Sequence, residues 1–457
     1  MTSFEIRSTL GIAFIYILRM LGLFIVLPIM AIYLGELSPE SNPLLIGLAF
    51  GIYGLTQGLF QIPFGLMSDY YGRKKMIIFG LLIFIIGSIF IYYSESLFMI
   101  IVGRALQGAG AISAVLLALL ADLTTDSART KSMAIIGASI GMTFGISIVV
   151  SPLLNIYLGF QNIFLLIALL SVLAIYVVIK YIPNPLKVKS SSISKASILS
   201  VVTDRTFLKL DYGIFALHAS QIIMFMMIPK ILNDIGYPVQ YHWQVYLPVF
   251  VISMILIVPM ILISMRKNML KVFFIFNVAI LILVQWLFAN YSDTKQHIMM
   301  VLLLYFIAFN FLEASLPSMV SRLSPKNLKG LILGAYNTSQ SLGIFVGGLL
   351  GGYIVSIFSN EAIFIVSGIL LIVWLVLMLN FIFPPNKKDM VIKIKPEFFH
   401  QPQSVLNKKL QILNKLNFVE ETLIFPSESY IIIKTNKEKT LDEKKVLKVI
   451  GEKNAIS

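Results

Sequence analysis

The sequence predicts an all-α membrane protein with about twelve membrane-spanning helices, followed by a small soluble α+β domain. The 457 residues are 58% hydrophobic and only 13% charged, whereas soluble domains are nearer half apolar and a quarter charged. Apolar runs of about 20 residues, enough to cross the hydrocarbon core of a bilayer, recur up to Phe383. After Pro385 the composition changes and becomes rich in Lys, Asn and Glu.

The spans are expected to begin close to the N-terminus. The first apolar run is too long for the 7–15-residue core of a signal peptide, so we interpret it as the first span. The predicted spans cover residues 9–34, 43–67, 75–93, 97–122, 130–155, 160–181, 209–233, 241–264, 270–290, 296–321, 326–355 and 360–383.

The basic residues are shared unequally between alternate connections. One set of loops holds 17 Lys and Arg residues, and the other holds only Lys230 and Lys295. Because basic loops stay in the cytoplasm, both termini are expected there, which requires an even number of spans. A net charge of +14 would also suit a nucleic-acid binder, but here the charge follows the topology. The expected partner is therefore the lipid bilayer and not a nucleic acid.

The longest connection divides the predicted spans into two sets of six. We expect an N-terminal half at 1–181, a cytoplasmic linker at 182–208, a C-terminal half at 209–385 and a soluble domain at 386–457. The stretch Ala121-Asp122-Leu123-Thr124 after the fourth span has a counterpart, Ser321-Arg322-Leu323-Ser324, after the tenth. Such a repeat suggests two related halves with a substrate site near the membrane midplane between them.

The connection at 65–75, GLMSDYYGRKK, which we name the signature loop, has the chemistry of a tight turn. Gly65 would allow a neighbouring helix to approach closely, and Gly72 would allow a positive φ. Asp69 is placed to pair with Arg73 or to face the N-terminus of another helix. The alternative is an ordinary basic turn with an incidental Asp.

The pattern G-x-x-x-D-x-x-G-R-K-K resembles the signature loop of the major facilitator superfamily, with Tyr70 in place of a usual basic residue. The fourth span carries Arg104 and Gln107 in a sequence similar to the family's R-x-x-Q-G-x-G motif. The resemblance implies a fold of two six-helix halves that transports by alternating access. It also implies that Asp122 joins Asp69 and Arg73 in a cluster that holds the cytoplasmic side closed in the outward-open state. The alternative is three solvated charges, with each pair contributing ~0–1 kcal/mol.

The first and fifth spans resemble the drug:proton antiporter branch of this family. The first has Leu21-Gly22 followed by Pro28, with Ala31 in place of a second proline. The fifth has a glycine-rich antiporter pattern in which Ser151 replaces the glycine of a Gly-Pro pair, which weakens the inference of antiport. Its motif residues are Gly137, Gly141, Gly145 and Pro152.

Longer segments, and the C-terminal extension, are similar to a bacterial inner-membrane member of the family. These segments are Leu18–Gly22, Gly51–Gln57, Phe60–Gly65 and Thr338–Gln340. The resemblance implies proton-driven export of a small molecule across the bacterial inner membrane. The proton gradient would be the energy source, with no cofactor and no metal.

A charged residue at the bilayer centre costs at least ~2.5–3.5 kcal/mol, so each ionisable residue inside a span needs a reason. In the family, an arginine at the position of Arg104 is linked to proton coupling. Because an Arg stays protonated, it cannot itself carry the proton. Its expected role is to influence the pKa of a neighbouring carboxylate or the electrostatic potential of the cavity. Glu313 is the only acid well inside a predicted span, which makes it the candidate proton carrier. For both residues, a purely structural role is the alternative.

Three further polar side chains inside the spans are candidates for the cavity. His218 could titrate near neutral pH or could be a hydrogen-bonded packing residue. Arg19 lies beside Gly22 on the first span, where a cavity role and a structural pairing are equally open. Gln57 belongs to a set of polar positions that could line a pore.

The tail alternates between strand and helix patterns. Strands are expected at Val391–Lys395, Phe418–Phe425 and Tyr430–Lys434, and helices at Gln403–Leu416 and Leu441–Ile450. The order βαββα, with at most a short last strand, predicts a ferredoxin-like sandwich. The chain has no cysteine, so a metal site built from paired Cys is not expected. The domain could stabilise the protein, form oligomers of an otherwise monomeric transport unit, or regulate it.

Two other classes of protein compete with a transporter. A membrane sensor or receptor could keep a transporter body and signal through the C-terminal domain. An enzyme is not expected, because the sequence shows no clustered metal-ligand spacing and no nucleophile elbow. The substrate and the direction of transport are not named by these patterns.

Overall fold

The chain forms two compact units, one made of Met1–Ser264 with Met269–Ile382 and one containing Phe383–Ser457. The computed structural model describes residues 3–37, 42–124, 126–183, 203–266, 269–325 and 328–383, and parts of 390–456. Most of the predicted linker at 182–208 lies outside the described residues. The predicted domain boundaries stay predictions.

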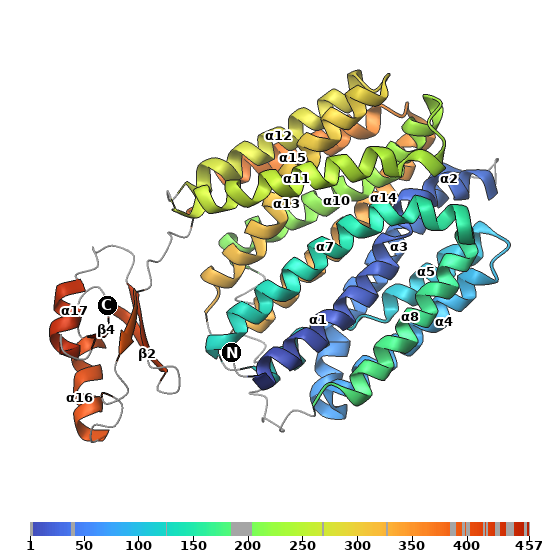
Figure 1. Ribbon diagram of the computed structural model, residues 1–457. Coiled ribbons are helices and arrows are strands. Elements are labelled where there is room, and N and C mark those ends of the chain that lie inside the picture. Colours follow the sequence, from blue (N-terminus) through green and yellow to red (C-terminus); the bar gives the residue numbers. More distant parts are fainter. Residues whose placement is uncertain are drawn as a thin grey trace. The chain divides into compact units, whose positions relative to one another are not determined.

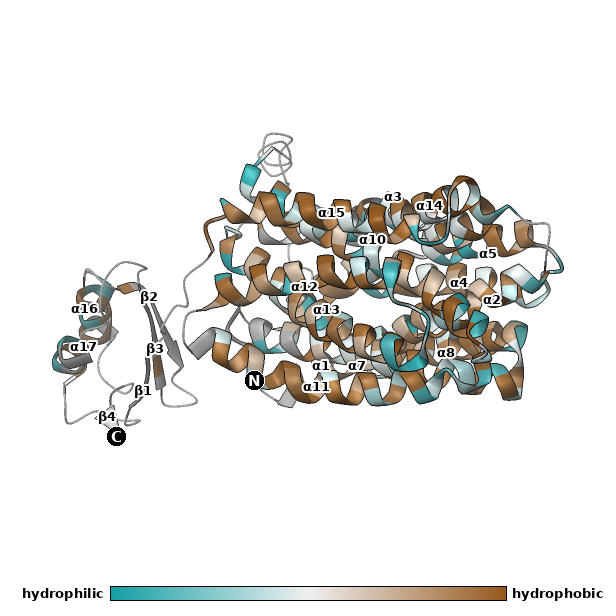
Figure 2. Ribbon diagram, turned by 90° about the horizontal axis from the view of Figure 1, so that it is seen from above, coloured by the Kyte–Doolittle hydropathy of each residue, from teal (hydrophilic) through white to brown (hydrophobic). Residues whose placement is uncertain are grey.

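Within the described residues, 12 helical stretches are long and apolar enough to cross a membrane, and six of them precede residue 184. This confirms the predicted number of spans, and Figure 2 shows hydrophobic positions along the length of these helices. In order (Figure 1), they are formed by α1 (Ser3–Phe24) with α2 (Leu27–Leu37), α3 (Pro43–Tyr71), α4 (Arg73–Tyr92), α5 (Leu97–Ala109) with α6 (Ser113–Leu123), α7 (Asp126–Leu158), α8 (Phe160–Lys180), α10 (Arg205–Asp234), η1 (Val239–Tyr241) with α11 (Trp243–Arg266), α12 (Leu270–Asn290), α13 (Lys295–Leu323), α14 (Lys329–Ile357) and α15 (Ala362–Leu379).

Two spans expected to be continuous helices are broken. The first span is interrupted between Phe24 and Leu27, just before Pro28, which has no N–H to donate to the preceding turn. The fourth is interrupted between Ala109 and Ser113. There Gly110 lies against the backbone of α4, where a Cβ would meet the carbonyl oxygen of Gly80. The break therefore lets the two helices approach to backbone contact.

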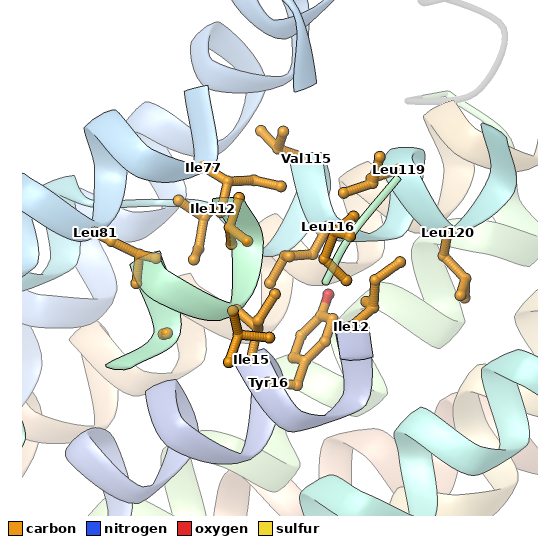
Figure 3. Packing of buried hydrophobic residues seen from close by; sticks show 14 of the residues in the cluster. Ile12, Ile15, Tyr16, Ile77, Leu81, Ile112, Val115, Leu116, Leu119 and Leu120 are labelled. Atoms are coloured by element: carbon orange, nitrogen blue, oxygen red, sulfur yellow. The ribbon is translucent and has the colours of Figure 1, made fainter. Parts of the chain in front are cut away.

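The first six spans share a buried apolar core around this break (Figure 3). Ile12 and Ile15 of α1 lie against Ile112 in the break and Leu116 of α6, and all four side chains are fully buried. Lipid tails are as apolar as these side chains, so close packing and hydrogen bonds, and not exclusion from water, favour this contact. The Tyr16 hydroxyl adds such a bond by donating to the Ser113 carbonyl oxygen at 2.8 Å.

The second unit contains strands and helices in the order β1, α16, β2, β3, α17, β4. Their bounds are β1 (Met390–Ile394), α16 (Gln403–Asn414), β2 (Val419–Phe425), β3 (Tyr430–Thr435), α17 (Glu443–Ile450) and β4 (Ala455–Ile456). The sheet order is β2-β3-β1-β4 with antiparallel neighbours, and Val391 pairs with Ile432. Buried apolar residues such as Phe398, Leu413 and Val446 make its core. The predicted turn at 426–429 lies outside the described residues.

Candidate functional site

The signature loop connects α3 to α4 and brings together the three charged residues that were expected to meet. An Arg73 guanidinium nitrogen lies 2.5 Å from an Asp69 carboxylate oxygen, and its Nε donates to Asp122 at 3.0 Å. Arg73 Nη1 also donates to the Ser68 hydroxyl at 2.5 Å. One arginine therefore joins the end of α3, the start of α4 and the end of α6.

The two glycines of the signature loop differ. Gly72 has φ of +95°, which confirms the expected positive φ. Gly65 does not show the expected close approach, because a Cβ there would lie 4.0 Å from Ala114, an ordinary contact distance. In this conformation Gly65 faces a residue of its own half.

Arg104 of α5 is fully buried and has no carboxylate partner among the described residues. Its Nη1 donates to Gln107 at 3.0 Å, and Gln107 donates to the Ser88 hydroxyl at 2.8 Å. The guanidinium lies 4.9 Å from the ring centre of Tyr53 on α3, a cation–π contact. Its Nε and Nη2 have no hydrogen-bond partner in the described part of the chain. Arg104 is thus a buried positive charge with two nitrogen donors, Nε and Nη2, that have no described partner.

Arg19 has a structural position at the break in the fourth span. Its Nη1 donates to the Ser113 hydroxyl at 2.6 Å, and its Nη2 donates to the Gly110 carbonyl oxygen at 3.3 Å. The side chain is 1% exposed. Of the two readings for Arg19, this geometry favours structural pairing, because the guanidinium joins α1 to a hydroxyl and a backbone carbonyl at the break.

His218 of α10 and Glu313 of α13 lie together in the second set of six spans. His218 Nε2 is 3.9 Å from Glu313 Oε2 and 2.7 Å from the Gln340 amide nitrogen of α14. His218 Nδ1 lies 3.2 Å from the Ile214 carbonyl oxygen. A carbonyl only accepts, so Nδ1 carries the proton, and Nε2 accepts from Gln340. The imidazole is neutral in this arrangement.

Glu313 differs from its neighbour His218 in exposure. Its side chain is 33% exposed, against 6% for His218. Its Oε2 is buried and has no hydrogen-bond partner among the described residues. Part of the Glu313 side chain is therefore exposed, while the carboxylate oxygen nearest the imidazole is buried. Gln340, which the sequence analysis did not single out as a site residue, supplies the hydrogen bond to the imidazole.

The predicted antiporter helix is α7, and its glycines face different surroundings. A Cβ on Gly145 would overlap the Phe250 ring of α11, so this glycine makes room for a helix of the other half. At Gly137 and Gly141, a Cβ would meet nothing within 4 Å in the described structure. Pro152 is buried inside α7, and Gln57 is buried on α3. The structure brings neither of these two residues to the His218 group.

A contact between α3 and α14, which sequence reasoning missed, joins the two halves. We name Gly47, Gly51, Gly54, Gly348 and Gly352 the glycine seam. A Cβ on Gly348 would lie 2.5 Å from the Gly47 carbonyl oxygen and 2.7 Å from the Gly51 nitrogen, so the backbones touch. The three- and four-residue glycine spacings on both helices were the available signal.

The seam lies at only one end of the bundle. It occupies the end where α3 begins and α14 finishes, opposite the signature loop. Toward the signature loop, a Cβ at Gly330 or Gly334 of α14 would meet nothing within 4 Å among the described residues. The halves are therefore in backbone contact at the seam end and not at these loop-end positions.

Comparison with known proteins agrees with this architecture. Residues 12–348 and 311–433 match the family described as the Major Facilitator Superfamily. The chain is 38% identical over 444 residues to the inner membrane transport protein YajR of Escherichia coli (strain K12), covering 96% of each chain. It is 29% identical over 155 residues to the class H tetracycline resistance protein of Pasteurella multocida, covering 34% of this chain and 38% of that protein.

A solved structure shows the same fold at low sequence identity. A D-xylose–proton symporter superposes with a TM-score of 0.69 at 15% identity, covering 84% of this chain and 99% of the symporter. The family match and the near full-length similarity to YajR together establish the relationship. The chain belongs to the major facilitator superfamily and is a multi-pass membrane transporter.

Proposed function

We propose that this transporter exports a small molecule in exchange for protons, by alternating access across a bacterial inner membrane. The observation that carries the proposal is the neutral imidazole of His218, which lies 3.9 Å from the unpartnered carboxylate oxygen of Glu313. The tetracycline resistance relatives and the inner-membrane location in the name of the E. coli relative support export and location.

The proposed coupling follows from which atoms can hold a proton. A proton on His218 Nε2 removes the lone pair that accepts from Gln340, so the amide must turn or leave. The new N–H then has a nearby acceptor in Glu313. A proton on Glu313 instead removes a charge from a low-dielectric site. Each protonation changes the contacts between α10, α13 and α14, and this can bias the equilibrium between conformations.

Proton movement in proteoliposomes tests this assignment. With tetracycline as the probe, the wild-type protein is expected to dissipate an imposed pH gradient, measured with an enclosed pH-sensitive dye. Glu313→Gln is expected to abolish this dissipation, and Glu36→Gln, at an exposed acid near the end of α2, is expected to leave it unchanged. Wild-type dissipation in Glu313→Gln would refute the proton-carrier role. A wild-type protein that binds the probe without moving protons would contradict export and fit a sensor.

For alternating access, we propose that the glycine seam is the closed gate of this conformation. With the basic loops and both termini in the cytoplasm, the seam closes the outer side and the signature loop faces inward. The Asp69–Arg73–Asp122 cluster is proposed to support closure of the opposite side in the outward-open state. Its described partners all belong to the first six spans, so here it stiffens that half.

Substitution of one seam glycine tests the gate, and another glycine on α14 provides the control. Gly348→Ala is expected to disfavour the closed seam by ~1–3 kcal/mol, since the added methyl group meets backbone atoms. Gly334→Ala should not disfavour it, because nothing described lies within 4 Å. The readout is labelling of Leu34→Cys, a buried α2 position, by a membrane-impermeant maleimide applied from outside. Equal labelling in both variants would contradict the gate.

We also propose that the second unit is a ferredoxin-like domain attached to the transport body. The support is its element order and the sheet order β2-β3-β1-β4, which together match a split βαβ arrangement. Its proposed role is regulation or oligomer formation around a transport unit that works as a monomer. Analytical ultracentrifugation of the full chain and of a chain ending at Phe383 distinguishes the two roles.

A further inference from the structure

Asp211 is a second acidic residue on the helix that carries His218. It lies seven residues before His218 in α10, so both side chains are on one face of the helix, about 10 Å apart along its axis. Asp211 is partly buried, and among the described residues its carboxylate has no hydrogen bond and no ion pair. An acid inside a membrane-spanning helix is unfavourable unless it has a use, and the coupling described above gives Asp211 none.

α14 lies beside α10 and runs in the same direction. A Cβ on Gly343 of α14 would meet the backbone of Phe215, and one on Gly347 would meet the backbone of Ala219. A step of four residues along one helix thus matches a step of four along the other. The interface between the two helices therefore continues from the His218 group toward the start of both helices, away from the glycine seam.

Tyr336 of α14 lies along this interface. It is one turn before Gln340, which donates to His218, so the two α14 side chains share a face of the helix. Tyr336 is 4% exposed, and its hydroxyl has no hydrogen-bond partner in the described part of the chain. The charges of Glu313 and Asp211 both act on this hydroxyl. A buried, unpartnered hydroxyl is therefore within electrostatic reach of two acids that lie on different helices.

The segment of α14 that precedes Tyr336 borders open space. A Cβ at Gly330 or Gly334 would meet nothing within 4 Å among the described residues, and neither glycine is buried. At the other end of α14 the glycine seam is in backbone contact with the first half. In this conformation, a proton that leaves Glu313 therefore has more room to reach solvent at the end that carries the signature loop.

We propose that Tyr336 and Asp211 carry the proton from Glu313 to the cytoplasmic end of the bundle. We name Glu313, Tyr336 and Asp211 the exit route. The inference rests on the proposed proton-coupled export and adds the residues through which the proton leaves.

The transfer along the exit route leaves no charge on the tyrosine. The O–H bond of protonated Glu313 breaks, and its proton passes to the Tyr336 oxygen, directly or through water. The hydroxyl proton of Tyr336 passes to the Asp211 carboxylate at the same time, because a hydroxyl both accepts and donates. Glu313 ends as a carboxylate, Tyr336 as a neutral phenol and Asp211 as a carboxylic acid. Asp211 then gives the proton to water at the cytoplasmic end.

Two kinds of flux in proteoliposomes test the exit route, with tetracycline as the probe. Net flux driven by a pH gradient requires the proton to leave, whereas equilibrium exchange of labelled for unlabelled tetracycline requires no proton step. Asp211→Asn is expected to lower net flux by about tenfold or more and to keep exchange within about twofold of the wild type. Asp211→Glu retains a carboxyl group and is expected to restore about half of the net flux or more.

Matched variants separate proton transfer from folding. Tyr336→Phe removes only the hydroxyl and is expected to lower net flux by about fivefold or more, again without loss of exchange. Tyr212→Phe makes the same change next to Asp211, but this hydroxyl already donates to the Leu370 carbonyl oxygen at 3.1 Å, so net flux should stay unchanged. Asp234→Asn, at the exposed opposite end of α10, should also leave both fluxes unchanged.

A labelling measurement examines Asp211 without transport. Dicyclohexylcarbodiimide, an apolar reagent that modifies protonated carboxyl groups, is expected to label Asp211 and Glu313 in the reconstituted full chain more than the exposed Asp234, as measured by peptide mass spectrometry. The proposal is overturned if Asp211 is not labelled, if Asp211→Asn keeps its net flux, or if net flux and exchange fall together in both Asp211→Asn and Tyr336→Phe. Labelled Asp211 in a wild-type protein that moves no protons would instead count against the export proposal alone.

Discussion

The buried ionisable groups of the two halves differ in whether their charge can change. Arg19 and Arg104 in the first half keep their protons under all physiological conditions, and their described hydrogen-bond partners are neutral. His218 and Glu313 in the second half can each gain or lose a proton, and they lie within 3.9 Å of each other. Under the proposed coupling, the first half would thus provide a fixed positive field and the second half the exchangeable charge.

This difference suggests a division of work between the halves. A buried charge without a counter-charge is unfavourable, so the unpaired donors of Arg104 need a function that a packed apolar residue would not supply. Arg19 differs in that both of its terminal nitrogens donate to groups at the helix break, and among the described residues only its Nε has no partner. Within the first half, therefore, Arg104 is the residue whose charge we expect to matter for transport, and Arg19 is the one whose geometry matters for folding.

The largest effect is expected from removing the fixed charge. Arg104→Met should reduce proton-coupled transport by roughly tenfold or more, equivalent to ~1.4 kcal/mol or more in the barrier. Arg104→Lys keeps the charge and should retain most of the activity. Proteoliposome flux measures both. If the two variants lose the same activity, the guanidinium geometry matters instead of the charge, and the proposed contrast between the halves fails.

A smaller effect is expected from removing the amide that faces the imidazole. Gln340→Leu leaves His218 Nε2 without its donor, so protonation next to Glu313 becomes easier. In a plot of transport rate against pH, the part of the curve that depends on this protonation should move to higher pH. The maximal rate should change by about two- to fivefold. Flux measured across a pH series gives the result. An unchanged profile would remove His218 from the coupling and leave Glu313 alone.

The smallest effect on transport is expected at Arg19. One ammonium group cannot replace both contacts of the guanidinium fork, so Arg19→Lys should lose ~1 kcal/mol of stability. Transport per folded molecule should stay within twofold of wild type. Thermal unfolding in detergent and flux normalised to folded protein separate the two quantities. A flux loss as large as that of Arg104→Met would place Arg19 in the coupling machinery.

Part of the candidate site could be predicted from local chemistry. Asp69 and Arg73 lie at helix ends beside a tight turn, where short-range geometry and Gly72 fix their positions. Asp122 lies on another helix, and only the resemblance to the family implied that it joins them. Glu313 and His218 stood out because an ionisable residue inside a span is unfavourable unless it has a use. Their proximity was not predicted, because it depends on how α10 and α13 rotate about their own axes.

The missed features depend on which faces of distant helices meet. The roles of Gly51 and Gly348 could not be predicted without knowing that α3 lies against α14. The contacts of Phe144 with Phe225 and Phe306 likewise depend on how α7 packs against the second half. Arg19 was left open between two roles because the break in the fourth span was not foreseen, and the break creates its partners.

The sequence by itself determined the class of protein, the number of spans and the family, because hydrophobic length and short loop motifs are properties of contiguous residues. The tertiary structure decided at which end of the bundle the two halves come into backbone contact, which groups Arg19 contacts and which groups surround His218. Each of these depends on contacts between residues about 100 or more positions apart, such as His218 with Gln340 and Arg19 with Ser113. In a membrane these contacts are set by close packing of side chains, which a pattern of apolar residues does not specify.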